Sequence, residues 1–342
     1  MTASFQADVL RLHEESFVVD LHVDSFLLSR QFGYDFLKPH RAWLPFGALG
    51  SHADLPRMKA GGVDAAGFGI VVNPLLGPGK AWRSSMRQIA LFHDACERSQ
   101  DQLTFAAAPD SALKLKQGGV RSGFLGLEGA HCLGDQLTNV ESAYHNGVRY
   151  ITLTHFSSNK AACCAKGLGS DPAKGLTSWG CELIAEMNRL GMIIDLAHVN
   201  RAGFLEAIRL SKTPCMVSHG GVASVRPHWR NTDHDMLQAL VDSGGIMGII
   251  FAPQFISDHY RDTSEAVLRH IDYMVTHFGE DSVAIGSDFD GYILTTPEDL
   301  RDIAMMPGLT AGMMRKGYSI ERIQKILGLN FIRVWQACYR TN

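Results

Sequence analysis

The sequence lacks any run of about 20 apolar residues, the length that a helix needs to cross a bilayer. It also lacks blocks of about five like charges, and its formal net charge is only -3, so nothing provides the basic footprint of a protein that binds nucleic acid or anionic lipid. The first residues, MTASFQADVLRLHEES, carry acids where a signal peptide would have an apolar core. These absences predict a cytoplasmic protein that binds neither nucleic acid nor membrane.

Paired cysteines are also missing. The chain has 7 cysteines, an odd number, and none has a CxxC spacing, which argues against a disulfide framework. Cys163 and Cys164 are adjacent, but neighbouring side chains usually point apart and no partner pair stands elsewhere, so we expect reduced thiols. There is no Pro-rich or Ser-rich linker and no internal repeat at a fixed period, and we therefore expect one domain over residues 1–342.

Short apolar runs are abundant and alternate with segments of helical periodicity, which is the pattern of repeated βα units. The runs are apolar on both faces, as expected for parallel strands covered by helices. Eight of them are found, at residues 16–22, 65–72, 122–128, 149–155, 191–198, 214–219, 245–251 and 282–288. Eight strands with interleaved helices in a chain of 342 residues predict an α/β fold. They favour a TIM-type (β/α)8 barrel over a doubly wound sheet.

Several helices can be placed from their apolar stripes and ends. Residues 178–190 have the helical spacing and are followed by Gly191, which suits the left-handed position after a helix. Asp233 is expected to cap the next helix, and further stripes cover 267–278 and the segment from Ser319. Two irregular stretches, 29–56 and 156–177, are predicted to be loops that enclose a substrate, because the loops after barrel strands form the catalytic face.

The polar residues of most interest share one property, since each lies at or within two residues of the carboxyl end of a predicted strand. In a parallel barrel these ends meet at one rim. Imidazoles and carboxylates are the ligands of Zn²⁺ and related ions. The set consists of His22, Asp24, Glu128, His155, His198, His219 and Asp288.

His22 and Asp24 are two residues apart, so both can point into the barrel mouth and bind one ion. An isolated HxD pair is more often a packed histidine and a turn-capping aspartate. His52 and Asp54 form such a pair, which follows no apolar strand, and we expect Asp54 to cap a helix and His52 not to be a ligand.

Glu128 ends its strand before Gly129 and can bridge two ions, although a salt-bridged glutamate is an equally good interpretation of this residue alone. His198 and His219 end consecutive strands, and neighbouring strands lie about 5 Å apart, so the two imidazoles can share an ion. A single histidine at a strand end would more often be a hydrogen-bonded core residue.

Two residues of this set, Asp288 and His155, can act on a substrate together with Arg230. Asp288 can accept a proton from an attacking water, with a turn-forming role as the alternative. Arg230 in HWRNTD can bind a substrate carboxylate through two parallel hydrogen bonds, whereas an isolated arginine is usually on the surface. His155 can donate to a carbonyl or an oxyanion.

Taken together, the chain resembles the renal or membrane dipeptidase family of zinc metallopeptidases, a branch of the amidohydrolase-like barrels. The resemblance covers about residues 16–338 and follows family order and spacing. It is carried by VVDLHVDSF, GFLGLEGAHCL, GVRYITLTH, EMNRLGMIIDLAHV, MVSHGGVASVRPHWRN, AIGSDFDG and IQKILGLNFIRVW.

This resemblance implies two Zn²⁺ ions, with His22 and Asp24 on one, His198 and His219 on the other, and Glu128 as the bridge. It also implies that His155 and Arg230 bind the substrate and that Asp288 handles the proton of a bridging hydroxide. The activity it implies is hydrolysis of the amide bond of small dipeptides. Relatives are often dimers, so a homodimer is expected.

The chain departs from the family pattern in two places. FSSNKAACCAKGLGSDP follows His155 where an NxPWxD-like segment is common, and IIFAPQFI lacks the tyrosine of IxFYP-type segments. These departures predict a changed substrate wall and a changed pocket for the leaving group. Two alternatives stay open. One is a different hydrolase on the same metal site, either a deacylase of N-acyl amino acids or another small-amide or lactone hydrolase. The other is a barrel that only binds a ligand or partner.

Overall fold

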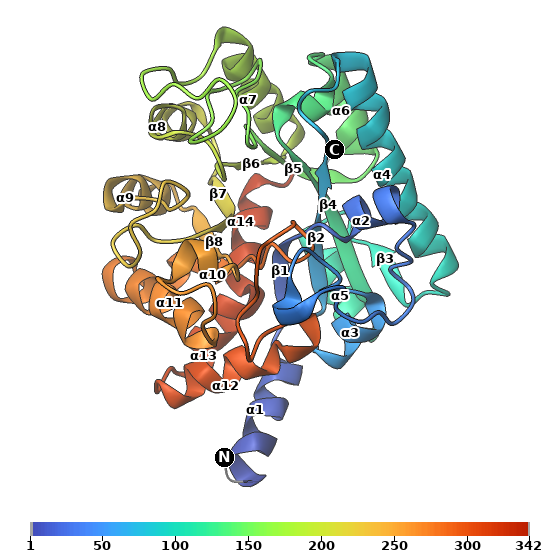
Figure 1. Ribbon diagram of the computed structural model, residues 1–342, viewed down its shortest axis with the longest axis vertical. Coiled ribbons are helices and arrows are strands. Elements are labelled where there is room, and N and C mark those ends of the chain that lie inside the picture. Colours follow the sequence, from blue (N-terminus) through green and yellow to red (C-terminus); the bar gives the residue numbers. More distant parts are fainter. Residues whose placement is uncertain (1–2, 341–342) are drawn as a thin grey trace.

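The computed structural model describes residues 3–340 and contains a nearly closed barrel of parallel strands surrounded by helices (Figure 1). The strand order is β1-β2-β4-β5-β6-β7-β8-β9, and every pairing is parallel. The barrel strands are β1 (Val19–Val23), β2 (Ala65–Val71), β4 (Arg121–Glu128), β5 (Val148–Thr152), β6 (Ile193–Asp195), β7 (Met216–Gly220), β8 (Ile246–Ile249) and β9 (Val283–Ile285). The predicted TIM-type barrel is confirmed.

The first and last strands meet through contacts just beyond β9. Val23 forms a parallel bridge with Phe289, the Asp24 amide donates to the Phe289 carbonyl at 2.8 Å, and the Asp288 amide donates to the His22 carbonyl at 3.0 Å. This closure brings two polar strand ends, separated by more than 260 positions in the chain, side by side.

A ninth strand, β3 (Leu103–Phe105), was not predicted. It pairs in parallel with the start of β4, outside the barrel order. Its three residues are too few to show a period, which is why hydrophobic patterning missed it.

The helices cover the outside of the barrel (Figure 1). They are α1 (Ala3–Glu15), α2 (Ser25–Phe32), α3 (Leu55–Ala60), α4 (Pro78–Arg98), α5 (Pro109–Gln117), α6 (Thr138–His145), α7 (Ser178–Leu190), α8 (Arg201–Leu210), α9 (His234–Asp242), α10 (Pro253–Ile256), α11 (Ser264–Phe278), α12 (Pro307–Arg315), α13 (Ile320–Gln324) and α14 (Asn330–Cys338). None of the helices within residues 3–340 combines the length and apolar character needed to cross a bilayer.

The predicted helix signals hold in most cases. Gly191 ends α7 with φ 76°, and the Asp233 side chain accepts from the Met236 amide at the start of α9. Ser319 caps the last helix as expected, and the helical backbone runs from α13 through a π-helical turn at Lys325–Leu329 into α14.

One end of the barrel is closed by packing. A cluster of buried residues joins the first residues of several strands, such as Val19 and Ile246, to Phe331 and Trp335 of α14. The ring of Phe331 stacks on Phe124 with centroids 4.9 Å apart. Because α14 seals the amino end of the strands, the carboxyl end is left for polar side chains.

The two predicted loops behave differently. Residues 156–177 form no helix or strand and contribute Phe156 to the cavity at the barrel mouth. Residues 29–56 contain the end of α2 and a short 3-10 turn at Pro45–Gly47, and none of them lines that cavity. Their link to it is indirect, since the Leu49 amide donates to the carbonyl of Ile293, a lining residue.

Candidate metal centre

Each predicted donor reaches the mouth of the barrel from the end of a strand. His22 and His219 lie in β1 and β7, Glu128 is the last residue of β4, and Asp24 directly precedes α2. His198 follows β6 with φ 63°, and Asp288 follows β9 with the same value. This left-handed backbone is uncommon for residues other than glycine and persists only where the surroundings fix it.

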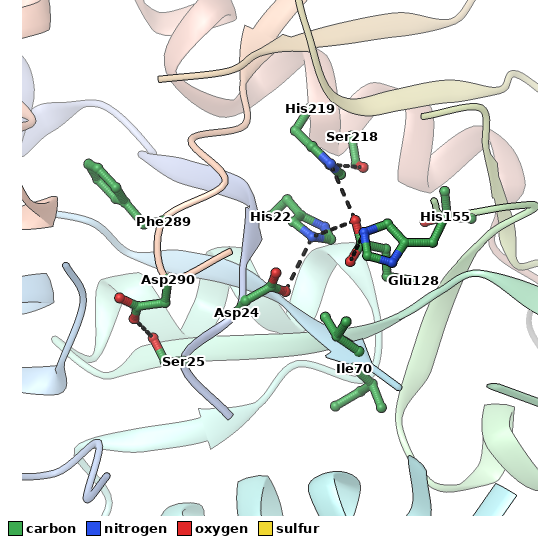
Figure 2. Close-up of polar contacts among 12 residues, drawn as sticks. His22, Asp24, Ser25, Ile70, Glu128, His155, Ser218, His219, Phe289 and Asp290 are labelled. Atoms are coloured by element: carbon green, nitrogen blue, oxygen red, sulfur yellow. Dashed lines mark hydrogen bonds and ion pairs between the residues drawn. The ribbon is translucent and has the colours of Figure 1, made fainter. Parts of the chain in front are cut away.

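The donor atoms converge on the carboxylate of Glu128 (Figure 2). Its Oε1 lies 3.0 Å from His198 Nε2, 3.4 Å from His219 Nε2 and 3.7 Å from His22 Nε2. His22 Nε2 also lies 3.3 Å from Asp24 Oδ1. Residues from four strand ends, spread over the chain from 22 to 219, therefore surround one point.

His155 and Asp288 join the same cluster. His155 Nε2 lies 3.5 Å from Glu128 Oε2. Three groups of three residues each offer one donor atom per residue, and within a group these atoms lie within 4.8 Å of one another. The groups are His22, Glu128 and His219; Glu128, His155 and His198; and His22, Asp24 and Asp288. All seven predicted imidazoles and carboxylates thus lie together at the rim.

Two buried donor atoms in this cluster have no hydrogen-bond partner, namely His22 Nε2 and Asp24 Oδ1. A buried polar atom without a partner is costly, and a bound cation would remove that cost for both. Gly69 of β2 leaves the room they need, because a Cβ atom there would lie 2.0 Å from Asp24 Oδ1 and 2.9 Å from His22 Nε2. The donor set therefore fits a metal ion.

Residues behind the cluster fix which nitrogen of two histidines faces it. The Tyr150 hydroxyl donates to the Leu21 carbonyl and lies 2.8 Å from His22 Nδ1, so it accepts the Nδ1 proton. The Ser218 hydroxyl donates to the Asp195 carboxylate at 2.6 Å and lies 2.9 Å from His219 Nδ1. It therefore accepts the Nδ1 proton of His219.

In His219, which is neutral, the Nε2 lone pair then faces the cluster, and in His22 the Nε2 atom faces it with a proton that a bound cation would displace. Sequence analysis missed these supporting residues. The available signal was a polar residue inside an apolar strand, as in FVVDLH and MIIDLAH, where Asp20 and Asp195 stand. Asp20 accepts from the backbone amides of His22 and Ser287 and so joins β1 to the segment that carries Asp288.

The excess of negative charge in the cluster favours cations. Burial raises the pKa of the Glu128 carboxyl well above its ordinary value, and the Asp24 carboxylate adds to this effect. Burial and Asp24 act in the same direction on the pKa of Asp288. Burial opposes the charged form of His22, but the carboxylates of Asp24, Glu128 and Asp288 outweigh it and raise its pKa to about 10. Three carboxylates held away from water attract positive charge.

The other imidazoles are held neutral. Burial lowers the pKa of His155, His198 and His219 well below the ordinary value, and the Arg230 guanidinium acts in the same direction. Arg230 is itself buried, with Nη2 donating to the His219 carbonyl at 2.8 Å. Neutral imidazole is the form that binds metal ions.

A cavity of about 230 Å³ lies over the cluster. Glu128, His155, His198, Arg230 and Asp288 contribute to its lining. Arg230 and His198 also line a neighbouring cavity of about 360 Å³. The expected substrate-binding residues therefore share one hollow with the donor atoms.

His52 and Asp54 lie outside the cluster, as expected. The Asp54 side chain accepts from the Arg57 amide and caps α3. His52 pairs with Asp290, whose carboxylate accepts from the His52 amide at 2.6 Å and from Ser25, and Figure 2 shows Asp290 directed away from Glu128. Asp290 is therefore a structural residue of this loop.

Comparison with known proteins identifies the family. The sequence profile of the membrane dipeptidases, peptidase family M19, matches residues 6–342. The chain belongs to this family. Dipeptidase tcpJ of Claviceps purpurea is 31% identical over 324 residues, which cover 92% of this chain and 75% of that protein.

Solved structures of metallopeptidases share the barrel. Dipeptidase AC, of the same M19 family, is 28% identical, with a TM-score of 0.84 over 95% of this chain and 99% of that one. A metallopeptidase of Rhodobacter sphaeroides, crystallised with a phosphinate mimic of the dipeptide L-Ala-D-Ala, is 26% identical, with a TM-score of 0.85 over 95% of this chain and 100% of the other. This M19 member is thus a metallopeptidase-type hydrolase built on the family's barrel.

Proposed function

We propose that this protein is a zinc-dependent dipeptidase with two metal sites that share the Glu128 carboxylate. His22 and Asp24 would hold one Zn²⁺, and His198 and His219 the other. The observation that carries this proposal is the convergence of three imidazoles on Glu128, at distances of 3.0 to 3.7 Å from its Oε1, with Asp24 beside one of them. The unpartnered Nε2 of His22 and Oδ1 of Asp24 support it.

Divalent cations bound there would acidify water toward a pKa of about 7 and polarise the amide carbonyl. The chain's own residues would do the rest. Arg230 holds the terminal carboxylate of the dipeptide and so fixes its position. His155 donates a hydrogen bond to the carbonyl oxygen as negative charge develops on it. Asp288 takes the proton of the attacking water and passes it to the leaving amine.

The dimensions of the cavity favour a small substrate. Its volume of about 230 Å³ lies below the range of roughly 300–1,000 Å³ that is typical of sites for drug-sized ligands. The dipeptide mimic bound by the Rhodobacter sphaeroides relative has a D-residue at its carboxyl end. We therefore include D-residues at that position among the substrates to be tested.

The test is a substrate panel run on protein of known metal content. Dipeptides with L- and D-residues at the carboxyl end are assayed beside N-acyl amino acids and lactones, and zinc is counted by elemental analysis. We expect dipeptide hydrolysis with two zinc equivalents per chain. Strong acyl or lactone hydrolysis without dipeptide turnover would favour the alternative hydrolase, and inert, metal-free protein that zinc does not activate would favour a binding role.

The support behind His219 gives a separate prediction. In Ser218→Ala, the His219 Nδ1 proton loses its acceptor, so the imidazole is less firmly oriented. We expect the affinity for zinc to fall by about 10–100-fold, measured by competition with a chelator. Ser4→Ala, on the exposed side of α1, is the control. Equal affinities in the two variants would show that Ser218 does not support a metal ligand.

The cytoplasmic location, the single domain over residues 1–342 and the homodimer stay predictions.

A further inference from the structure

Gln254 is a polar side chain at the active-site cavity whose chemistry is not used by the proposed mechanism. It lies in α10, lines the cavity together with Arg230 and Asp288, and its Oε1 is buried without a hydrogen-bond partner. An unpartnered buried amide oxygen is unfavourable unless a ligand or water satisfies it. Because Gln254 lines the cavity, a rotation of its amide would bring this oxygen to a bound substrate.

The strand order shows which part of the substrate Gln254 faces. Arg230 follows β7, Asp288 follows β9, and β8, which leads into α10, lies between these two strands. In the proposed function, the leaving amino acid has its carboxylate on Arg230 and its amine beside Asp288. The Cα atom of that amino acid then lies between the two, and its side chain faces α10 in one of the two enantiomers.

The neighbours of Gln254 hold α10 in place. Phe255 packs against His228 and Trp229 with ring centroids 5.2 and 6.2 Å away. Ala252 stands where the family resemblance leads us to expect a tyrosine, and it is fully buried and absent from the cavity lining. The hydrogen-bonding group that α10 offers to the leaving amino acid is therefore the Gln254 amide.

We propose that Gln254 determines specificity for a leaving amino acid with an uncharged, hydrogen-bonding side chain, above all a carboxamide. This inference rests on the proposed function. A carboxamide both donates and accepts, so it pairs with Gln254 in either orientation of the amide. A site that hydrogen-bonds its substrate discriminates against an analogue that leaves the protein group unpaired.

The experiment compares kcat/KM for Ala–Asn and Ala–Leu, which differ little in shape, with L- and D-residues at the carboxyl end. We expect the wild-type protein to favour Asn by about 5–10-fold in the accepted stereochemistry, the ratio that one hydrogen bond provides. In Gln254→Met the ratio should fall to one or below. In Gln254→Glu, which adds a carboxylate, preference should move toward Ala–Lys. Gln6→Met, an exposed change in α1, is the matched control and should keep the wild-type ratio.

The outcomes separate the two proposals. If wild type and Gln254→Met both hydrolyse Ala–Asn and Ala–Leu with the same ratio, the specificity role is wrong and the dipeptidase function stands. If the wild-type protein with zinc bound hydrolyses none of these dipeptides, the proposed function fails and the inference fails with it. Zinc content and thermal unfolding, measured on each variant, exclude misfolding as the cause of a changed ratio.

Discussion

Asp288→Asn is expected to lose about 10²–10⁴-fold in kcat, the contribution of a positioned general base, while the protein keeps its bound zinc. The amide has nearly the shape of the carboxylate but cannot accept the proton. Single-turnover rates on a dipeptide, with zinc counted on the same sample, measure both parts of this prediction.

The control for Asp288→Asn is Asp94→Asn, an exposed position in α4 that should behave as the wild type. Undiminished turnover would remove Asp288 from the reaction. Loss of one zinc equivalent would have a different meaning, because Asp288 lies within 4.8 Å of the donor atoms of His22 and Asp24. It would make Asp288 a metal ligand in place of a proton carrier.

Glu128→Gln is expected to remove at least one zinc ion and with it most of the activity. The glutamine has no charge, and one of its two terminal atoms is an NH₂ group that cannot coordinate a cation. Removing one partner of a buried charge interaction costs about 3–5 kcal/mol, which corresponds to roughly 10²–10⁴-fold in zinc affinity. Because Glu128 contacts the imidazoles of both proposed sites, no other single change should affect both ions as strongly.

Elemental analysis after dialysis, with Glu97→Gln on the exposed side of α4 as control, measures the effect on zinc. Two zinc equivalents retained by Glu128→Gln would contradict the shared-carboxylate arrangement. Calorimetric titration with zinc would then show whether the two ions bind independently.

Much of the fold could be predicted from the sequence because barrel strands and their helices have strong local signatures. The eight predicted strands are short apolar runs, and α7 covers the predicted residues 178–190 and ends at Gly191. The local rules failed where the signal was short or ambiguous. β3 has three residues, and the π-helical turn inside the last helix does not interrupt its apolar stripe, so hydrophobic spacing could locate neither.

The candidate residues could also be predicted, because each stands at the end of an apolar run. Asp54, expected to cap a helix, does so in α3, and Asp290 accepts from the His52 amide, so neither belongs to the metal donors. The support from Tyr150 and Ser218 could not be predicted, since a hydroxyl inside a strand does not reveal which histidine it will meet.

By itself, the sequence determined the order of strands and helices, the family motifs and the set of imidazoles and carboxylates at strand ends. These features depend on spacing along the chain, which a sequence records directly. Only the tertiary structure decided that β1 and β9 close the barrel and that the donors meet around Glu128. It also decided that Phe156, and no residue of 29–56, lines the cavity, and that Gln254 lines it with an amide oxygen that has no partner. Those features depend on distances between residues far apart in the chain, and such distances are fixed only when the barrel closes and its core packs.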